Sequence, residues 1–206
     1  MRGDAKKSWP VEERTTLGSG AISTFVNEVV LTPAGTRMNR QFLTHPGAVA
    51  VVAWDEAADE ILVLRQYRHP VGMELVEIPA GLLDVEGEDY CLAAQRELAE
   101  EAELQAGRWD VLVDIFSTPG ACEESLRVFL ARDLSSAPRP QGFVPEDEEA
   151  EMTSTFTSRA AIVEMILNGE CESPSLVSGV LALETARLLG RLDSLRPSDA
   201  PWLARQ

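Results

Sequence analysis

The sequence contains few of the residues that build disulfide frameworks or transition-metal sites. Its 206 residues include three cysteines and two histidines. The cysteines, Cys91, Cys122 and Cys171, contain no CxxC pair, and their odd number argues against a disulfide framework. The histidines, His45 and His69, have no acidic or cysteine partner at metal-ligand spacing. We therefore expect no disulfide scaffold and no zinc site, and the free thiols favour the reducing cytoplasm.

Long apolar runs and basic residues are also scarce. No apolar run approaches the ~20 residues that span a bilayer, and we expect no signal peptide because the N-terminal stretch lacks an apolar core. Lys and Arg total 18 against 34 Asp and Glu, which gives a net charge of −16. This charge repels nucleic-acid backbones and anionic membranes, so we expect neither as a partner. It also raises the question of whether some carboxylates hold a hard cation.

Composition and patterning predict a globular chain of mixed α and β structure. Hydrophobic residues make up 45% of the sequence and charged residues 25%, which suffices for a sizeable core. The apolar run at 48–54 is typical of a strand buried on both faces, with a hairpin partner at 61–64. Further strands are expected at 22–31, 38–43, 75–78, 109–116 and 125–131, and helices at 90–102, 158–167 and 176–192.

These elements divide the chain into three regions. We expect residues 1–45 to form a small β subdomain whose first 14 residues are loose, and residues 46–195 to form the main domain. Residues 196–206 are expected to be a frayed tail, and residues 135–145, rich in Pro, Ser and Gly, a loop. Because strands and helices mix without a regular βαβ rhythm, the fold class is α+β or a mixed-sheet α/β/α sandwich.

The helix expected at 90–102 carries a concentration of carboxylates. Glu97, Glu100 and Glu101 are spaced i, i+3 and i+4, so their side chains lie on one helix face. Like charges at this spacing destabilise a helix by roughly 0.2–0.5 kcal/mol per pair. Spacing alone leaves two interpretations open: a solvated acidic face, or a site for a divalent cation such as Mg²⁺, which prefers oxygen ligands. For Arg96, the cation of this helix, the structural alternative is a surface ion pair with Glu100.

The residues around this helix resemble the Nudix hydrolase motif, Gly-x5-Glu-x7-Arg-Glu-U-x-Glu-Glu-x-Gly-U, in which U is aliphatic. The chain has Gly81, Glu88 and then the run Arg96-Glu97-Leu98-Ala99-Glu100-Glu101. There are two departures: six residues instead of five separate Gly81 from Glu88, and Glu103 stands where the second Gly is usual. The first lengthens a loop. The second replaces the glycine that commonly supplies a left-handed helix cap.

The resemblance implies a Nudix-type α/β/α sandwich with a mixed sheet and assigns roles to the motif residues. It implies a site for Mg²⁺, or for Mn²⁺ in its place, whose ligands are Glu97, Glu100, Glu101 and the carbonyl of Ala80. It also implies that Glu88 pairs with Arg96 and, with Gly81, supports the loop that precedes the helix.

Four flanking segments resemble the bacterial ADP-ribose pyrophosphatase branch of this family. They are residues 65–68 (RQYR), 77–84 (EIPAGLLD), 117–120 (STPG) and the acidic segment 146–152. The resemblance covers roughly residues 20–190. It implies hydrolysis of ADP-ribose to AMP and ribose 5-phosphate by a homodimer with exchanged N-terminal subdomains.

The branch also implies residues that act outside the helix. By motif match the catalytic base is Glu148, with Glu149 as the alternative, acting together with the metal ligand Glu101. The run at 146–149 has a second interpretation, a solvated acidic loop.

Three further residues are candidates for substrate binding. Arg40 and Arg68 match arginines near the substrate, where a guanidinium can clamp a phosphate; each is equally suited to a structural ion pair. Glu124 follows the turn at 119–120 and is expected to contact ribose or metal.

Other functions remain open at this point. The same chemistry applies to other nucleoside diphosphate-linked substrates, such as a sugar nucleotide, a dinucleotide or coenzyme A. A nucleotide sensor without activity and an acidic dimeric scaffold are further alternatives. The retained carboxylates Glu97, Glu100 and Glu101 count against a sensor, because a pure binder does not need three mutually repelling groups.

Overall fold

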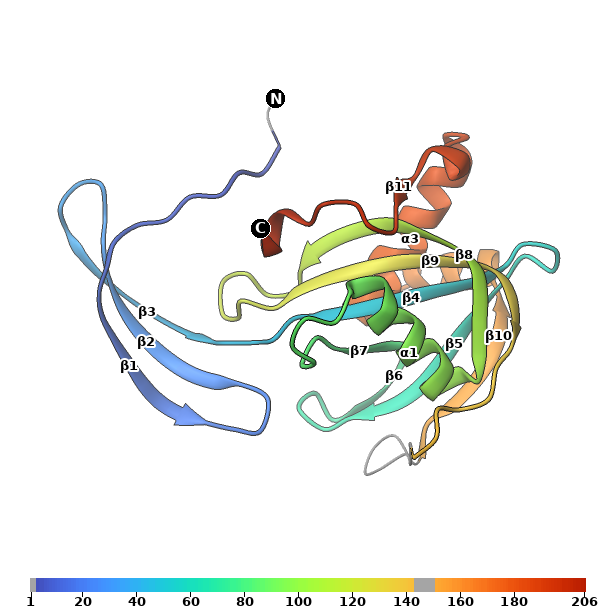
Figure 1. The fold of residues 1–206 in the computed structure, drawn as a ribbon, viewed down its shortest axis with the longest axis horizontal. Helices are drawn as coiled ribbons and strands as arrows, with labels where there is room; N and C mark the ends of the chain where they lie inside the picture. Colours follow the sequence, from blue (N-terminus) through green and yellow to red (C-terminus); the bar gives the residue numbers. More distant parts are fainter. Residues whose placement is uncertain (1–2, 143–150) are drawn as a thin grey trace. The chain divides into compact units, whose positions relative to one another are not determined.

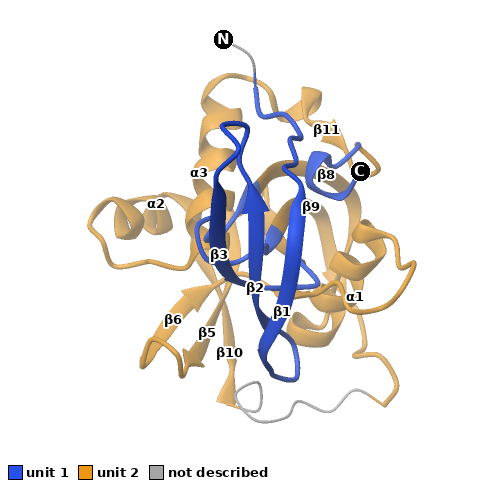
Figure 2. Ribbon diagram, turned by 90° about the vertical axis from the view of Figure 1, so that its left-hand side faces the viewer, with its two compact units in different colours: residues 1–47, 115–125, 201–206 blue, residues 48–114, 126–200 orange. Residues whose placement is uncertain are grey.

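The computed structural model describes residues 3–142 and 151–206, and they form two compact units (Figure 2). The first unit contains the chain up to Gly47 together with Ile115–Ser125 and Pro201–Gln206. The second contains the described residues of Ala48–Asp114 and Leu126–Ala200. The first unit therefore begins as the predicted N-terminal subdomain does, but it also takes in two later segments that the sequence did not assign to it.

The first unit contains a three-stranded antiparallel sheet in the order β1-β2-β3. Its strands are β1 (Val11–Ser19), β2 (Thr24–Leu31) and β3 (Arg37–Leu43). The expectation that the first 14 residues are loose is wrong from Val11 onward, because β1 pairs with β2 along most of its length. All nine residues of β1 are exposed, so the strand lacks the apolar alternation by which sequence patterning recognises a strand.

The second unit is built on a mixed sheet in the order β10-β5-β4-β9-β8-β11, with β6 paired to β5 and β7 to β4 (Figure 1). The central strand β4 (Ala48–Asp55) runs parallel to β9 (Ser125–Ser136) and antiparallel to β5 (Glu60–Arg68). The other strands are β6 (Met73–Glu77), β7 (Ala80–Leu82), β8 (Leu104–Phe116), β10 (Thr153–Ser158) and β11 (Arg196–Pro197). The apolar run of β4 is buried on both faces, as predicted.

Helices cover both faces of this sheet, which gives the predicted α/β/α layers (Figure 2). Val49 and Val51 of β4 pack with Leu98 of α1 (Tyr90–Ala102) on one face. The alternate residue Val52 faces Gly179 of α3 (Pro174–Leu188) on the other face, since successive strand residues point to opposite sides. Helix α2 (Arg159–Leu167) packs beside α3. Within the described residues, no helix has the length and apolar character needed to cross a bilayer.

The expected frayed tail at 196–206 is also wrong. Strand β11 pairs with β8, and a short 3-10 turn spans Leu203–Arg205. Ala200 and Trp202 are buried, and buried Arg127 donates a hydrogen bond of 2.7 Å to the carbonyl of Ala200. This partner lies 73 residues away along the chain, which explains why the local polar composition suggested a loose end.

Candidate active site

Helix α1 begins and ends with specific caps. The Asp89 carboxylate accepts hydrogen bonds from the backbone N–H groups of Cys91 and Leu92, at 2.9 and 3.1 Å. At the other end Glu103 adopts the left-handed conformation, with φ 55°, and its N–H donates to the carbonyl of Ala99. Glu103 therefore has the backbone conformation of the motif glycine that it replaces, and the helix ends at the residue that the pattern predicts.

Gly81 provides the space in which the Glu97 carboxylate lies. Strand β7 pairs with β4, which places Gly81 opposite Val49 beside α1. A Cβ atom built on Gly81 would lie 1.9 Å from Cδ of Glu97 and 2.0 Å from its Oε1. Glu97 is 8% exposed, so its carboxylate is packed against the backbone of this strand. The motif glycine is thus required at this point because it has no side chain.

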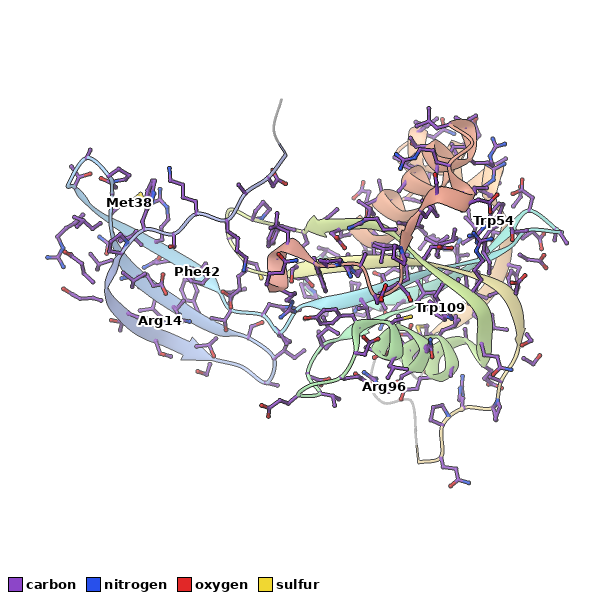
Figure 3. The ribbon with its side chains drawn as sticks, turned by 45° about the horizontal axis from the view of Figure 1, so that its top comes forward. Arg14, Met38, Phe42, Trp54, Arg96 and Trp109 are labelled. Atoms are coloured by element: carbon purple, nitrogen blue, oxygen red, sulfur yellow. The ribbon has the colours of Figure 1, made fainter. Side chains whose placement is uncertain are left out.

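Arg96, which is labelled in Figure 3, connects three of the motif carboxylates. Its Nε and Nη2 donate to both oxygens of Glu88, at 3.2 and 3.1 Å. Its Nη1 lies 2.6 Å from Glu97 and 3.1 Å from Glu100. The hydrogen bonds that Arg96 donates to Glu88 raise the pKa of Arg96, partial burial lowers it, and the charges of Glu97, Glu88 and Glu100 raise it further. The predicted Glu88–Arg96 pair is present, and Arg96 is more than the surface partner of a single glutamate.

Glu101 is held at the end of the β6–β7 connection. One of its carboxylate oxygens accepts the backbone N–H of Ala80 at 2.9 Å. The motif residues of α1 and the backbone of residues 80–81 therefore lie together, as the resemblance implied.

The donor chemistry of this group fits a hard divalent cation, whereas its present side-chain arrangement is that of an ion-pair network. Carboxylates and a backbone carbonyl are the ligands that Mg²⁺ and Mn²⁺ accept. Across residues 3–142 and 151–206, no three acidic, histidine or cysteine side chains are gathered as they would be around an ion. Arg96 Nη1 contacts Oε1 of Glu97 and Oε2 of Glu100, which is one oxygen of each of two expected ligands.

Arg68 is held by a residue that the sequence did not single out. Glu77, at the end of β6, receives hydrogen bonds from Nε and Nη2 of Arg68 at 3.0 and 2.6 Å. Glu77 is 5% exposed, whereas the Arg68 side chain is 40% exposed. The pair has the bidentate geometry that fixes a guanidinium plane. Both residues stood in the flanking motifs, but their partnership depends on the β5–β6 pairing.

Two other predicted substrate residues belong to the first unit. Arg40 lies exposed on β3 and donates to the carbonyl of Asn39 at 2.9 Å. Glu124 accepts a hydrogen bond from the Ser117 hydroxyl, and its other oxygen lies 3.7 Å from Nε2 of His45. His45 has no acidic residue at ligand spacing in the sequence, but in space it lies beside Glu124, which is 79 positions later in the chain. The predicted bases Glu148 and Glu149 lie outside the described residues.

Comparison with known proteins identifies the family. The model of the NUDIX domain matches residues 44–168, which is more than half of the chain and includes the whole motif. The chain belongs to the Nudix family. The Nudix motif residues lie on β7, in the loop that precedes α1, and on α1 with its C-terminal cap.

Several curated Nudix relatives are similar over most of their length. The ADP-ribose pyrophosphatase of Mycobacterium tuberculosis is 41% identical over 190 residues, which cover 92% of this chain and 89% of that protein. The ADP-ribose pyrophosphatase of Bacillus subtilis is 35% identical, covering 75% and 84%. The GDP-mannose pyrophosphatase of Cronobacter sakazakii is 26% identical, covering 76% and 82%.

The Nudix fold is also found among solved structures. A crystal structure of an ADP compounds hydrolase superimposes with a TM-score of 0.73 at 19% identity, covering 92% of this chain and all of that one. At this identity the likeness establishes the fold, which agrees with the predicted mixed-sheet α/β/α sandwich.

Proposed function

We propose that this Nudix enzyme hydrolyses the diphosphate of ADP-ribose, in a Mg²⁺-dependent reaction, to AMP and ribose 5-phosphate. The observation that carries the proposal is the group formed by Glu97 and Glu100 beside Arg96, with Glu101 held by the N–H of Ala80 and Gly81 leaving room for Glu97. The substrate is supported by the relatives named ADP-ribose pyrophosphatase, one of which covers 92% of the chain.

The chain's own residues bind and orient the reacting groups. A divalent cation, when bound, would neutralise the diphosphate charge and polarise a phosphoryl oxygen. Glu97, Glu100, Glu101 and the carbonyl of Ala80 would hold it. Glu88 keeps Arg96 beside these carboxylates, because two hydrogen bonds join the pair. This support matters because a carboxylate displaced by about 1 Å can lower the rate 10²-fold.

Two further roles belong to this proposal. Glu148, or Glu149 in its place, would take the proton from the attacking water. Arg68, oriented by Glu77, would bind a phosphate or another anionic part of the substrate, and Arg40 and Glu124 would contribute further contacts. The comparison of Glu148→Gln with Glu149→Gln tests the base: the variant that loses kcat while retaining KM identifies it.

We also propose that the protein is a homodimer and that it is located in the cytoplasm. A homodimer is supported by the three-stranded sheet of the first unit, on which Val11, Leu17 and Phe25 are exposed. A cytoplasmic location is supported by the three cysteines, all of which are free thiols.

A sugar nucleotide is the second candidate substrate. It is favoured by the similarity to the GDP-mannose pyrophosphatase, which extends over 76% of the chain. The two substrates share the diphosphate chemistry and differ in the groups attached to it. A comparison of kcat/KM for ADP-ribose and GDP-mannose ranks them.

The decisive experiment measures AMP release from ADP-ribose with and without Mg²⁺. Wild-type protein should form AMP only with Mg²⁺, and Glu101→Gln should lower kcat at least 10²-fold. The matched control is Glu103→Gln, which removes the same charge two residues away at the exposed helix cap and should retain activity. If folded Glu101→Gln keeps full turnover, the assignment of the metal site is wrong. If Mg²⁺ raises the melting temperature but no AMP forms, the substrate is wrong and the metal site remains.

A further inference from the structure

The last turn of α1 carries two of the three expected metal ligands, Glu100 and Glu101, and contains no basic residue. The last carbonyl groups of any helix lack partners within the helix, and negative partial charge accumulates at this end. Glu103, the capping residue, adds another carboxylate there. The C-terminal end of α1 is therefore expected to fray unless a group from elsewhere in the chain binds it.

The segment that follows β9 supplies such a group. The N–H of Ala137 donates to the carbonyl of Glu103 at 2.8 Å, so the chain runs past the end of α1 (Figure 1). Two residues later, Nε of Arg139 donates to the carbonyl of Glu100 at 3.1 Å and lies 3.4 Å from Oε1 of Glu103. The guanidinium therefore satisfies a carbonyl at the end of the helix and places a positive charge at the negative end of its dipole.

The three expected ligands differ in how much they depend on this end of the helix. Glu97 lies one turn earlier, is 8% exposed and is packed against β7. A hydrogen bond from β7 holds the Glu101 carboxylate, but it does not hold the helix backbone that carries Glu100 and Glu101. Loss of the Arg139 contact is therefore expected to loosen the last turn and to displace these two carboxylates, while Glu97 stays in place.

We propose that Arg139 is a positioning residue of this Nudix enzyme. By binding the carbonyl of Glu100 it holds the last turn of α1, and with it the carboxylates of Glu100 and Glu101. Its effect on the cation and the substrate passes through the helix backbone, because the guanidinium contacts the end of α1. The inference rests on the proposed function in one respect, namely that these two carboxylates bind the cation.

The first test is hydrogen–deuterium exchange of the full chain without Mg²⁺ and without substrate. Arg139→Gln should speed the exchange of the amides at 99–103 by about threefold or more, whereas the amides of β4 should exchange as in wild type. Arg139→Lys should restore much of the protection, because an ammonium group keeps the charge and can donate to the same carbonyl. Unchanged exchange at 99–103 in Arg139→Gln would overturn the proposal.

The second test measures AMP release from ADP-ribose as a function of Mg²⁺ concentration. Arg139→Gln should lower kcat about tenfold and raise the Mg²⁺ concentration at half-maximal activity, while KM for ADP-ribose stays near the wild-type value. Glu103→Gln loses the ion pair but keeps the hydrogen bond to Glu100, so it should resemble wild type. Arg108→Gln is the matched control, because Arg108 is 40% exposed against 43% for Arg139 and also pairs with acidic residues.

The outcomes separate a positioning role from a structural one. A lower melting temperature in Arg139→Gln with wild-type kcat and Mg²⁺ dependence would make Arg139 a structural helix cap and overturn the proposal. An equal loss of kcat in Arg108→Gln would overturn it as well, because the loss would then follow from the change in net charge. If wild-type protein releases no AMP, the proposed function fails. The exchange rates and the Mg²⁺-dependent rise in melting temperature then decide the role of Arg139 without substrate.

Discussion

Replacing Gly81 by alanine should damage the active site far more than the fold. The added Cβ would lie 1.9–2.4 Å from three atoms of the Glu97 carboxylate, and these are the three nearest atoms. Ordinary van der Waals contact begins near 3.4 Å, so the carboxylate must retreat by about 1.5 Å. Gly81 does not have a positive φ, so alanine fits the backbone without strain. The clash is therefore relieved by movement of the Glu97 side chain and not by distortion of the backbone.

The expected magnitudes differ between stability and catalysis. The retreat removes the 2.6 Å contact between Glu97 and Arg96, a partly exposed ion pair worth about 1 kcal/mol. For a chain of this size that lowers the melting temperature by about 2–4 °C. A displacement above 1 Å at a metal ligand should lower kcat by about 10²-fold or more. The midpoint of the Mg²⁺-dependent rise in melting temperature should move to higher Mg²⁺ concentration.

The assays are AMP release and thermal unfolding with and without Mg²⁺. Gly18→Ala is the control, because nothing lies within 4 Å of its Cβ and its φ is not positive. A double variant with Glu97→Gln adds a further check: once Glu97 is disabled, Gly81→Ala should cost little more. Independent, additive losses would refute the reasoning, and so would a Gly81→Ala protein with wild-type kcat.

Three further substitutions test the packing, the helix cap and an acid-sensitive ion pair. Gly179→Ala should destabilise the protein by about 1–3 kcal/mol in urea unfolding, because its Cβ would lie 2.8 Å from a buried valine methyl group of β4. Glu103→Gly should raise the free energy of unfolding by about 1 kcal/mol, because glycine adopts φ 55° without strain; an unchanged urea midpoint would contradict this. The hydrogen bond from Arg159 lowers the pKa of Asp59 below 3.8, so its contribution to stability is present above that pH and is lost as the pH falls further. Asp59→Asn should therefore lose less stability than wild type between pH 6 and about pH 3, as measured by urea midpoints.

Elements with strong local patterns were predicted closely from the sequence. The helix at 90–102 has the predicted bounds, because alanines, leucines and glutamates favour helix and no Gly or Pro interrupts them. The doubly buried strand at 48–54 was equally clear, because a continuous apolar run requires cover on both faces.

Elements without such patterns were missed. Strand β1 is exposed throughout, and β10 (TSTFTS) is polar and almost entirely exposed. Strand β7 has three residues, which is too short for any alternation to be read. Each of these strands is stabilised by backbone pairing with a neighbouring strand, and such pairing leaves little trace in side-chain composition.

The candidate site also contains features that the sequence predicted and features that it did not. The motif predicted the Glu88–Arg96 pair, which the structure contains, while the metal-ligand role of Glu97, Glu100 and Glu101 stays a prediction. The sequence did not reveal that Glu77 orients Arg68 by hydrogen bonding. The presence of Glu77 in the flanking segment 77–84 was the one hint that it has a role.

The sequence by itself determined that three carboxylates share one face of α1, because the i, i+3, i+4 spacing places them there on any helix that contains it. Only the tertiary structure decided how deeply each carboxylate is buried and which group it contacts. Glu97 is buried against Gly81 of β7, while Glu101 is held by the N–H of Ala80, since β7 pairs with β4 beside α1. Helical spacing is a local property of the backbone, whereas burial and hydrogen-bond partners depend on which distant segment packs against it.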